Sequence, residues 1–309
     1  MQRLTLDGGV PDHLKGSVVA LGNFDGFHLG HQAVVNRAIQ RAFHERRPAI
    51  VATFDPHPVK FFKPDIPPFR LTTLDQREDL FAHAGADAML VFEFNRALAA
   101  TDAEEFVRDV LAGRIGAAGV ITGDDFSFGK GRTGDPALLK TLGAQHGVVA
   151  EAVPQVLLDG ERISSGRIRE ALIAGDSGTA THMLSRPYTI AGVVQRGDAR
   201  GRELGYPTAN VELGDYQRPK YGIYAVRVTI DDGSEHPGVA SLGVRPTFEP
   251  PQELLEAYIF DFDGDLYGRT IEVALHAYIR EEEKFESVEA LVAQMQDDEA
   301  AARRLLALP

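Results

Sequence analysis

The sequence predicts an α/β protein of two domains, a doubly wound parallel sheet followed by an antiparallel barrel or sandwich. The chain has 309 residues, which is about the length of two domains. In the first half, short apolar runs alternate with amphipathic stretches, as in βαβ units. In the second half, strand-like segments follow one another without helices between them. A helical pattern ends at Pro187, so we predict domains of residues 1–184 and 185–309.

Four apolar runs rich in β-branched or aromatic residues predict the buried strands of the first half. They read SVVALGNF, AIVATF, DAMLVFEF and AAGVITG. Residues 29–47 carry apolar side chains at helical spacing. Two more helices are predicted to begin with capping boxes, one formed by Thr73 and Gln76 and the other by Thr101 and Glu104. Both of these helices are predicted to end at a glycine.

Five further strands are predicted in the second half, from the segments YTIAGVVQRG, GIYAVRVTI, HPGVASLGV, LLEAYIFDF and TIEVALHAYI. The turn signals DDG at 231–233 and DGD at 263–265 separate pairs of them. A final helix follows, with Ser287 as its N-cap. This order predicts an antiparallel β domain that is closed by one C-terminal helix.

The composition is that of an ordinary globular protein. Apolar residues make up 44% and charged residues 25%, and the absence of cysteine excludes disulfides and thiolate metal sites. Residues 1–16 lack the basic-then-apolar pattern of a signal peptide. No apolar run approaches the roughly 20 residues that a membrane span requires. We therefore expect a cytoplasmic protein with no membrane partner.

The net charge of −13 argues against a nucleic-acid partner. Residues 1–182 hold 19 basic and 23 acidic side chains, and the remainder holds 13 and 22. Neither part has the basic surplus of a protein that follows a phosphate backbone. Anionic ligands must then be met by local arginines, backbone amides or a metal ion.

A strand-to-helix corner, GNFDGFHLGH at 22–31, is the first candidate site. Gly30 lets a ligand approach the backbone, and the helix N-terminus offers amides to a phosphate. Neutral His28 and His31 can donate hydrogen bonds to phosphate oxygens in a transition state. TFDPHP at 53–58 and GDDFSFG at 123–129 also follow predicted strands, so we expect the three corners to converge at one sheet edge.

Two other interpretations of the histidine pair remain open. One histidine can serve as a helix cap while the other packs in the core. A zinc site is the weaker interpretation, because no Glu lies between the histidines and no Cys exists. Downstream, Ser164 and Ser165 precede a helical run with Arg167 and Arg169, a combination that can clamp phosphates or simply cap a helix.

The second candidate site is GRELGYPTANVEL at 201–213. Pro207 removes one ladder hydrogen bond, and Thr208 and Asn210 then point to one face of an extended chain. Their oxygen atoms suit Mg²⁺ that arrives with a nucleotide. Glu256, among apolar residues of a predicted strand, is a candidate general base, although it can equally face solvent. DFDGDLYG lacks the spacing of a calcium loop.

The first half resembles the nucleotidylyltransferase superfamily, through HLGH and the downstream ISS…R element. More narrowly, NFDGFHLGHQ, TFDPHP, GDDFSFGKGRTGD and ISSGRIREAL resemble the FMN adenylyltransferase module of bacterial bifunctional riboflavin kinase/FAD synthetases, in order, over most of 16–182. The resemblance implies a Rossmann-like domain with a parallel sheet that transfers AMP from Mg-ATP to FMN and releases pyrophosphate.

That resemblance also assigns site residues. It implies that His28 and His31 are catalytic and stabilise the transition state. It places Asp25, His57 and Asp125 at the flavin and nucleotide pocket. The residues implied to bind ATP and its phosphates are Gly22, Phe24, Gly30, Ser164, Ser165 and Arg169. Gly166 stands where this family usually has Thr, which removes one hydroxyl from the phosphate clamp.

The second half resembles the riboflavin kinase module of the same family. GRELGYPTAN, YGIYAV, LGVRPTF, DFDGDLYG and IREEEKFESVEAL match in order over about 187–305. The resemblance implies a Greek-key barrel with a C-terminal helix that transfers the γ-phosphate of ATP to riboflavin. Thr208 and Asn210 would then bind Mg²⁺, and Glu256 would be the base. Gly201 and Gly205 would lie in the nucleotide loop, and Arg280 near the flavin.

The predicted function is thus phosphorylation of riboflavin to FMN and adenylylation of FMN to FAD, with ATP and Mg²⁺ in both steps. Three alternatives remain: an adenylyltransferase for nicotinamide mononucleotide or phosphopantetheine, an OB-like nucleic-acid platform, and a kinase with a degenerate first domain. The sequence leaves the oligomeric state open, a transient homo-oligomer included. Val244 before Arg245 departs from the more usual pattern in this family and concerns the detail of the pocket.

Overall fold

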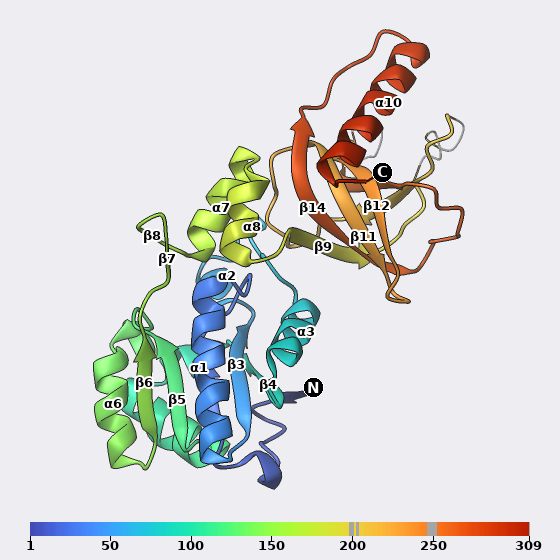
Figure 1. Cartoon of the computed structure of the whole chain (residues 1–309). Coiled ribbons are helices and arrows are strands. Elements are labelled where there is room, and N and C mark those ends of the chain that lie inside the picture. Colours follow the sequence, from blue (N-terminus) through green and yellow to red (C-terminus); the bar gives the residue numbers. More distant parts are fainter. Residues whose placement is uncertain (198–200, 202–203, 246–251, 309) are drawn as a thin grey trace. The chain divides into compact units, whose positions relative to one another are not determined.

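A computed structural model, shown in Figure 1, describes residues 1–197, 201, 204–245 and 252–308. It contains two compact units, one of Met1–Pro67 with Thr72–Ser164 and one of Pro68–Leu71 with Ser165–Pro309. The predicted domain boundary after residue 184 stays a prediction. Parts of two motifs, 202–203 and 246–248, lie outside the described residues.

The first unit contains a parallel sheet, as the alternating pattern predicts. In the described residues it has six strands in the order β1-β4-β3-β2-β5-β6, all neighbours parallel. The chain runs outward from the central β2 first to one side and then to the other, which is the doubly wound arrangement. The strands are β1 (Gln2–Thr5), β2 (Val18–Leu21), β3 (Ala49–Asp55), β4 (Ala88–Glu93), β5 (Gly119–Gly123) and β6 (Val149–Val153).

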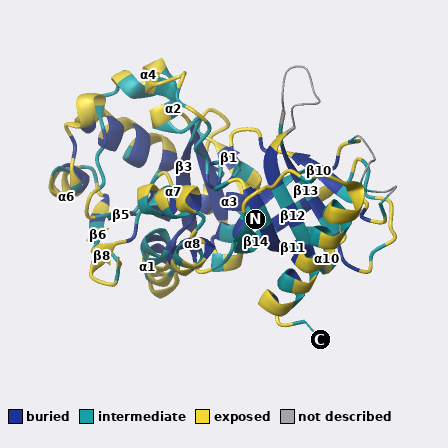
Figure 2. Cartoon of the chain, turned by 90° about the horizontal axis from the view of Figure 1, so that it is seen from above, coloured by how far each residue is buried: buried dark blue, intermediate teal, exposed yellow. Residues whose placement is uncertain are grey.

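Helices cover both faces of this sheet and enclose two apolar cores (Figures 1 and 2). Buried side chains of α1 and α3 pack on one face, and those of η2 and α6 pack on the other. The helical segments are η1 (Asp12–Leu14), α1 (Leu29–Glu45), α2 (Pro58–Phe62), α3 (Leu74–Ala84), α4 (Arg96–Ala100), α5 (Ala103–Glu105), the π-helical η2 (Phe106–Ile115), η3 (Lys130–Arg132) and α6 (Pro136–Gln145). A small hairpin of β7 (Leu157–Leu158) and β8 (Glu161–Arg162) ends the unit.

One of the two predicted capping boxes is confirmed. The Thr73 side chain accepts a hydrogen bond from the Gln76 amide, and the Gln76 side-chain oxygen accepts one from the Thr73 amide. The helix ends at Gly85 with φ 96°. The box at Thr101 and Glu104 is wrong. Asp102 is the N-cap there, since its carboxylate accepts from the Glu105 amide, and Thr101 ends the preceding helix.

The second unit carries an antiparallel sheet, in the order β10-β13-β12-β11-β14-β9 over the described residues. The sheet curls until Gln195, just after β9, bridges to Asn210 of β10, so the two edges approach closure. The elements are α7 (Ser165–Ala174), α8 (Ser177–Leu184), β9 (Tyr188–Val193), β10 (Thr208–Glu212), β11 (Gly222–Ile230), β12 (Glu235–Arg245), β13 (Gln252–Ile259), β14 (Thr270–Arg280) and α10 (Val288–Leu305).

Helix α10 begins where the sequence predicts, because Ser287 accepts a hydrogen bond from the Ala290 amide. It packs through Ala302 and Leu306 against Ala225 and Phe260 of the curled sheet. The predicted fold class, a parallel α/β domain followed by an antiparallel barrel with a C-terminal helix, is confirmed. None of the helices that the structure describes has the length and apolar content needed to cross a bilayer.

The difference between the two capping boxes gives a first prediction. Thr73→Ala should lower the free energy of unfolding by about 1 kcal/mol, because it removes a side-chain cap from α3. Thr101→Ala is the matched control and should cost less than about 0.5 kcal/mol, since Thr101 caps no helix N-terminus. Urea denaturation followed by circular dichroism measures both, and equal losses would contradict the assignment of the caps.

Candidate active sites

The sequence predicts that three corners converge, and in the structure these corners follow neighbouring strands. Residues 22–31 follow β2, residues 53–58 include the end of β3, and residues 123–129 include the end of β5. Since β3, β2 and β5 are adjacent and parallel, their carboxyl ends lie at the same edge. From β2 the chain continues to β3 on one side of it, and from β5 it continues to β6 on the other side. The carboxyl ends of β2 and β5 therefore flank a switch point, where ligands of open α/β sheets bind.

His28 is the N-cap of α1 and is buried, with 5% of its surface exposed. Its Nδ1 accepts a hydrogen bond from the His31 amide at 3.3 Å. The imidazoles of His28 and His31 are stacked, with 3.6 Å between ring centroids. Burial, with a smaller contribution from the nearby positive charge of Arg162, lowers the pKa of His28 to about 4. His28 is therefore neutral at pH 7.

This arrangement determines where the proton of His28 resides. A neutral imidazole has one donor and one acceptor nitrogen. Because Nδ1 accepts from the His31 amide, the proton must lie on Nε2. His28 therefore combines the cap function that the sequence left open with a neutral N–H donor, and the two interpretations are compatible.

Two contacts from other parts of the unit brace the loop between β2 and α1. The carboxylate of buried Asp25 accepts from the Thr72 amide at 3.0 Å. The guanidinium of buried Arg77, on α3, donates to the Asn23 carbonyl at 3.1 Å and to Thr53 Oγ1 at 2.7 Å. Sequence reasoning missed Thr72 and Arg77, although the charge of Arg77 on a buried helix face was the available signal.

The two glycines of the loop lie against side chains. A Cβ on Gly22 would come within 3.0 Å of the Phe24 ring, and a Cβ on Gly30 within 3.1 Å of the His28 imidazole. Phe24 itself adopts φ 50°, a conformation that side chains rarely take and that is common at ligand-binding corners. These residues therefore set the shape of the corner. The ATP contacts predicted for them stay predictions.

The other two corners carry His57 and Asp125. The Nδ1 atom of His57 caps the short helix α2 by accepting from the Val59 amide at 3.2 Å. Asp125 forms an ion pair with Arg162, and both charges act on His28. His28, Asp125 and Arg162 are therefore neighbours. Sequence reasoning missed Arg162, although it directly precedes the ISS motif.

The ISS element divides between the two compact units. In the first unit, the carbonyl oxygen of Ile163 lies 3.8 Å from the position of a Cβ on Gly30, so the residue before Ser164 lies close to the start of α1. In the second unit, Ser165 begins α7, and the Arg169 guanidinium donates to the Phe69 carbonyl at 2.7 Å and covers the Phe69 ring. Their predicted phosphate contacts stay predictions.

In the second unit, strand register brings three polar residues into one row. Asn210 of β10 is paired with Glu256 of β13, and Glu256 is paired with Ser241 of β12. Directly opposed residues of antiparallel strands share a face and have Cβ atoms about 4.5–5.5 Å apart. Thr208, two residues before Asn210, lies on that face as well. Sequence reasoning found Asn210 and Glu256 but not Ser241.

Asn210 has an unusual environment. It is 5% exposed, and its Oδ1 atom has no hydrogen-bond donor among the residues that the structure describes. Its Nδ2 atom donates weakly to the Thr208 carbonyl at 3.4 Å. A buried acceptor without a donor costs free energy, so it is typical of a position that binds a cation or ligand.

The remaining predicted residues of this unit have defined local roles. The Gly201 carbonyl accepts from the Tyr206 amide at 2.7 Å, and a Cβ on Gly201 would overlap with the Tyr206 carbonyl. Gly205 has φ 85° and closes the same turn. Arg280 makes two hydrogen bonds, of 2.7 and 2.6 Å, to the buried carboxylate of Asp298 on α10. The flavin contact predicted for Arg280 stays a prediction.

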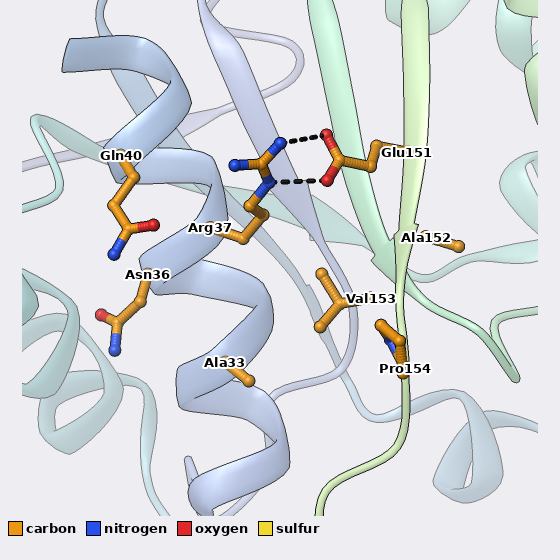
Figure 3. Close-up of a pocket in the computed structure, with 8 residues that line it drawn as sticks. All are labelled: Ala33, Asn36, Arg37, Gln40, Glu151, Ala152, Val153 and Pro154. Carbon is orange, nitrogen blue, oxygen red and sulfur yellow. Dashed lines mark hydrogen bonds and ion pairs between the residues drawn. The ribbon is translucent and has the colours of Figure 1, made fainter. Parts of the chain in front are cut away.

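The first unit also has a surface pocket between α1 and β6 (Figure 3). Arg37 of α1 and Glu151 of β6 face each other across it and form two hydrogen bonds, of 2.6 and 3.0 Å. No predicted site residue lines it, so we assign it to neither site. The lining residues are Ala33, Asn36, Arg37, Gln40, Glu151, Ala152, Val153 and Pro154.

The two arrangements together define the class of protein. A neutral imidazole donor at the switch point of a parallel sheet, and a row with a buried amide oxygen and a carboxylate on a curled antiparallel sheet, are typical of a transferase that handles phosphate groups at two sites. Comparisons with known proteins agree. A family model for FAD synthetase matches residues 10–167, and one for riboflavin kinase matches residues 184–306.

Whole-length relatives carry the same pair of modules. The chain is 43% identical over 298 residues to the bifunctional riboflavin kinase/FMN adenylyltransferase of Pseudomonas fluorescens, covering 96% of this chain and 95% of the relative. It is 38% identical over 294 residues to the protein of the same description from Escherichia coli (strain K12), covering 95% and 94%. The chain belongs to this family. The function predicted from the resemblance is confirmed: the chain is a bifunctional riboflavin kinase and FMN adenylyltransferase.

A solved structure supports the fold over nearly the full length. It comes from Streptococcus pneumoniae, where the protein is described as a macrolide-efflux protein, and it matches with a TM-score of 0.87 and 32% identity over 98% of this chain and 99% of that chain. That description belongs to the Streptococcus pneumoniae protein. The activity of this chain follows from the two family models and the curated relatives.

The lowered pKa of His28 predicts a pH-dependent stability. The folded state holds fewer protons than the unfolded state between about pH 6.5 and 4, so the stabilisation is complete above 6.5 and is lost as the pH falls toward 4. Between pH 7 and 5 we expect a loss of about 2 kcal/mol from this group. His28→Asn keeps a capping side chain and should remove that loss, whereas exposed His44→Asn should not. Urea denaturation at both pH values measures the difference.

Proposed function

We propose that the two reactions take place at separate sites, one on each sheet. At the parallel sheet, an oxygen of the FMN phosphate attacks the α-phosphorus of ATP, a new P–O bond forms, and pyrophosphate leaves. The attacking oxygen is already anionic, so the step requires alignment and charge neutralisation rather than a base. The observation that supports His28 in this step is its buried, neutral imidazole with the proton on Nε2.

The kinase site in this proposal is the row on the antiparallel sheet. The 5′-hydroxyl of riboflavin attacks the γ-phosphorus of ATP, Glu256 takes the hydroxyl proton, and ADP leaves. The observation that supports this assignment is the register that pairs Glu256 with Asn210. It brings a carboxylate beside a buried amide oxygen that lacks a donor among the described residues.

The residues of this row fit Mg²⁺. Thr208 and Asn210 supply neutral oxygen atoms. The Oδ1 atom of Asn210, which accepts no hydrogen bond from the described residues, is the kind of ligand that a hard cation prefers. Among the described residues, no group of three or more His, Asp or Glu side chains could hold a metal by itself. We therefore propose that Thr208 and Asn210 hold the ion together with nucleotide phosphates and water, and that it neutralises phosphate charge there.

The remaining assignments belong to the same proposal. Ser164, Ser165 and Arg169 bind the outgoing phosphates, and Asp25, His57 and Asp125 line the nucleotide and flavin pocket. Gly201 and Gly205 shape the loop over the nucleotide of the kinase site, where their hydrogen-bonded turn supports this role. The enzyme acts in the cytoplasm, where ATP and reduced conditions suit a chain without cysteine.

His28→Ala separates the two activities. We expect FAD formation from FMN and ATP to fall by about a hundredfold or more, because a positioned donor to the transition state is lost. Formation of FMN from riboflavin should stay within twofold. The assay incubates the purified chain with ATP, Mg²⁺ and either flavin, and separates the flavins by chromatography. His44→Ala is the matched control. A variant that loses both activities while remaining folded would contradict separate sites.

Glu256→Gln should have the opposite effect. Riboflavin phosphorylation should fall by about a hundredfold or more, because the general base is lost, while adenylylation of supplied FMN continues. Glu212→Gln changes an exposed carboxylate at the end of β10 and should leave both reactions intact. Asn210→Ala should shift the Mg²⁺ dependence of the kinase step to higher concentrations. Full kinase activity in Glu256→Gln would rule out this base.

A further inference from the structure

A second carboxylate reaches the kinase row, from a residue to which the sequence motifs assign no role. The Ser241 hydroxyl donates to Glu282 Oε1 at 2.8 Å. Glu282 follows the end of β14, whereas Ser241 lies in β12, so the contact joins segments 41 residues apart. Ser241 is also the register partner of Glu256. Glu282 therefore contacts a residue of β12 that lies directly opposite the proposed base on β13.

Gly243 provides the space for this carboxylate. It lies two residues after Ser241 on the same face of β12, and a Cβ at this position would overlap with the Glu282 carboxylate. The backbone of Gly243 has no positive φ, so its conformation does not require glycine. A Cβ at Gly243 would therefore have to displace the end of the exposed, flexible Glu282 side chain.

We propose that Ser241 and Glu282 form a subsite for the polyol chain of riboflavin, binding a ribityl hydroxyl next to the one that is phosphorylated. The proposal rests on the kinase site described above and adds the specificity of its acceptor side. It concerns positioning of the substrate, and neither residue takes part in proton transfer.

The order of residues along the row supports this assignment. Asn210 on β10 marks the end where the cation and phosphates bind, and Glu256 on β13 marks the reacting hydroxyl. Ser241 on β12 is the next position on the other side. Cross-strand neighbours are about 4.5–5.5 Å apart, a spacing that a short polyol chain can span. The substrate hydroxyls beyond the reacting one must then lie toward Ser241 and Glu282.

The chemistry of the pair fits a hydroxyl. A serine hydroxyl that donates to a carboxylate keeps its lone pairs as acceptors, and an ionised carboxylate offers several acceptor positions. A substrate hydroxyl can donate to either group and is thereby distinguished from a methylene, which can donate to neither. Hydrogen bonds to charged groups are among the stronger ones, so the loss of the pair should be measurable in substrate affinity.

The experiment compares the full-length parent with Ser241→Ala and Glu282→Gln in the kinase reaction. The substrates are riboflavin and three analogues that lack the 2′, 3′ or 4′ hydroxyl. We expect both variants to raise KM for riboflavin about tenfold with kcat changed less than threefold. For one analogue the parent should already show the raised KM, and the variants should add less than twofold.

Three further variants make the result specific. Gly243→Ala keeps both polar groups but displaces the carboxylate, so it should raise KM as Glu282→Gln does. Glu283→Gln removes an exposed neighbouring carboxylate and should leave KM unchanged. Glu256→Gln tests the kinase site itself. Adenylylation of supplied FMN and the melting temperature report whether each variant is folded.

Two outcomes would overturn the subsite. One is an unchanged KM for riboflavin in both Ser241→Ala and Glu282→Gln. The other is a rise of the same size for all three analogues, which a purely structural role would produce. If Glu256→Gln is inactive while either outcome occurs, only the polyol subsite fails. If Glu256→Gln is fully active, the proposed kinase site fails.

Discussion

Strand register is the constraint on which both sites depend. Side chains of a strand alternate between faces, so a shift of one residue would move every polar group of a row to the opposite side. In the antiparallel sheet, the pairing of Asn210 with Glu256 and of Glu256 with Ser241 places three polar side chains on one face. In the parallel sheet, the adjacency of β3, β2 and β5 brings three distant loops to one edge.

In a chain of net charge −13, both proposed sites combine neutral polar groups with a cation, Arg169 at one and Mg²⁺ at the other. Burial keeps His28 uncharged, and its own N-cap contact leaves a single donor nitrogen. On the other sheet, the side-chain oxygens of Thr208 and Asn210, proposed as Mg²⁺ ligands, are neutral as well. Of the nearby charges, Arg162 is paired with Asp125, and Arg280 with Asp298. Preorganised neutral dipoles such as these can stabilise charge that develops in a transition state.

The sequence predicts what local patterns encode. The capping box at Thr73 and Gln76 is correct because its donors and acceptors are three residues apart. The box at Thr101 fails because Asp102, one residue later, is also a strong N-cap and takes the position. The edge strand β6 was not predicted, since Val149 is 60% exposed and the segment lacks the continuous apolar run of a buried strand. The other edge strand, β1, has only four residues.

Long-range pairings are the part that the sequence does not reveal. The family resemblance places Arg280 near the flavin, yet only the fold shows that Asp298 of α10 engages its guanidinium. Gly243 is a second residue whose long-range contact the sequence does not reveal. In a strand pattern a glycine suggests a weak point or a close approach, without saying of what. The structure supplies the answer, because Glu282 arrives from a segment beyond the next two strands of the sheet. The side chain that a larger residue at position 243 would displace thus lies 39 residues away in the sequence.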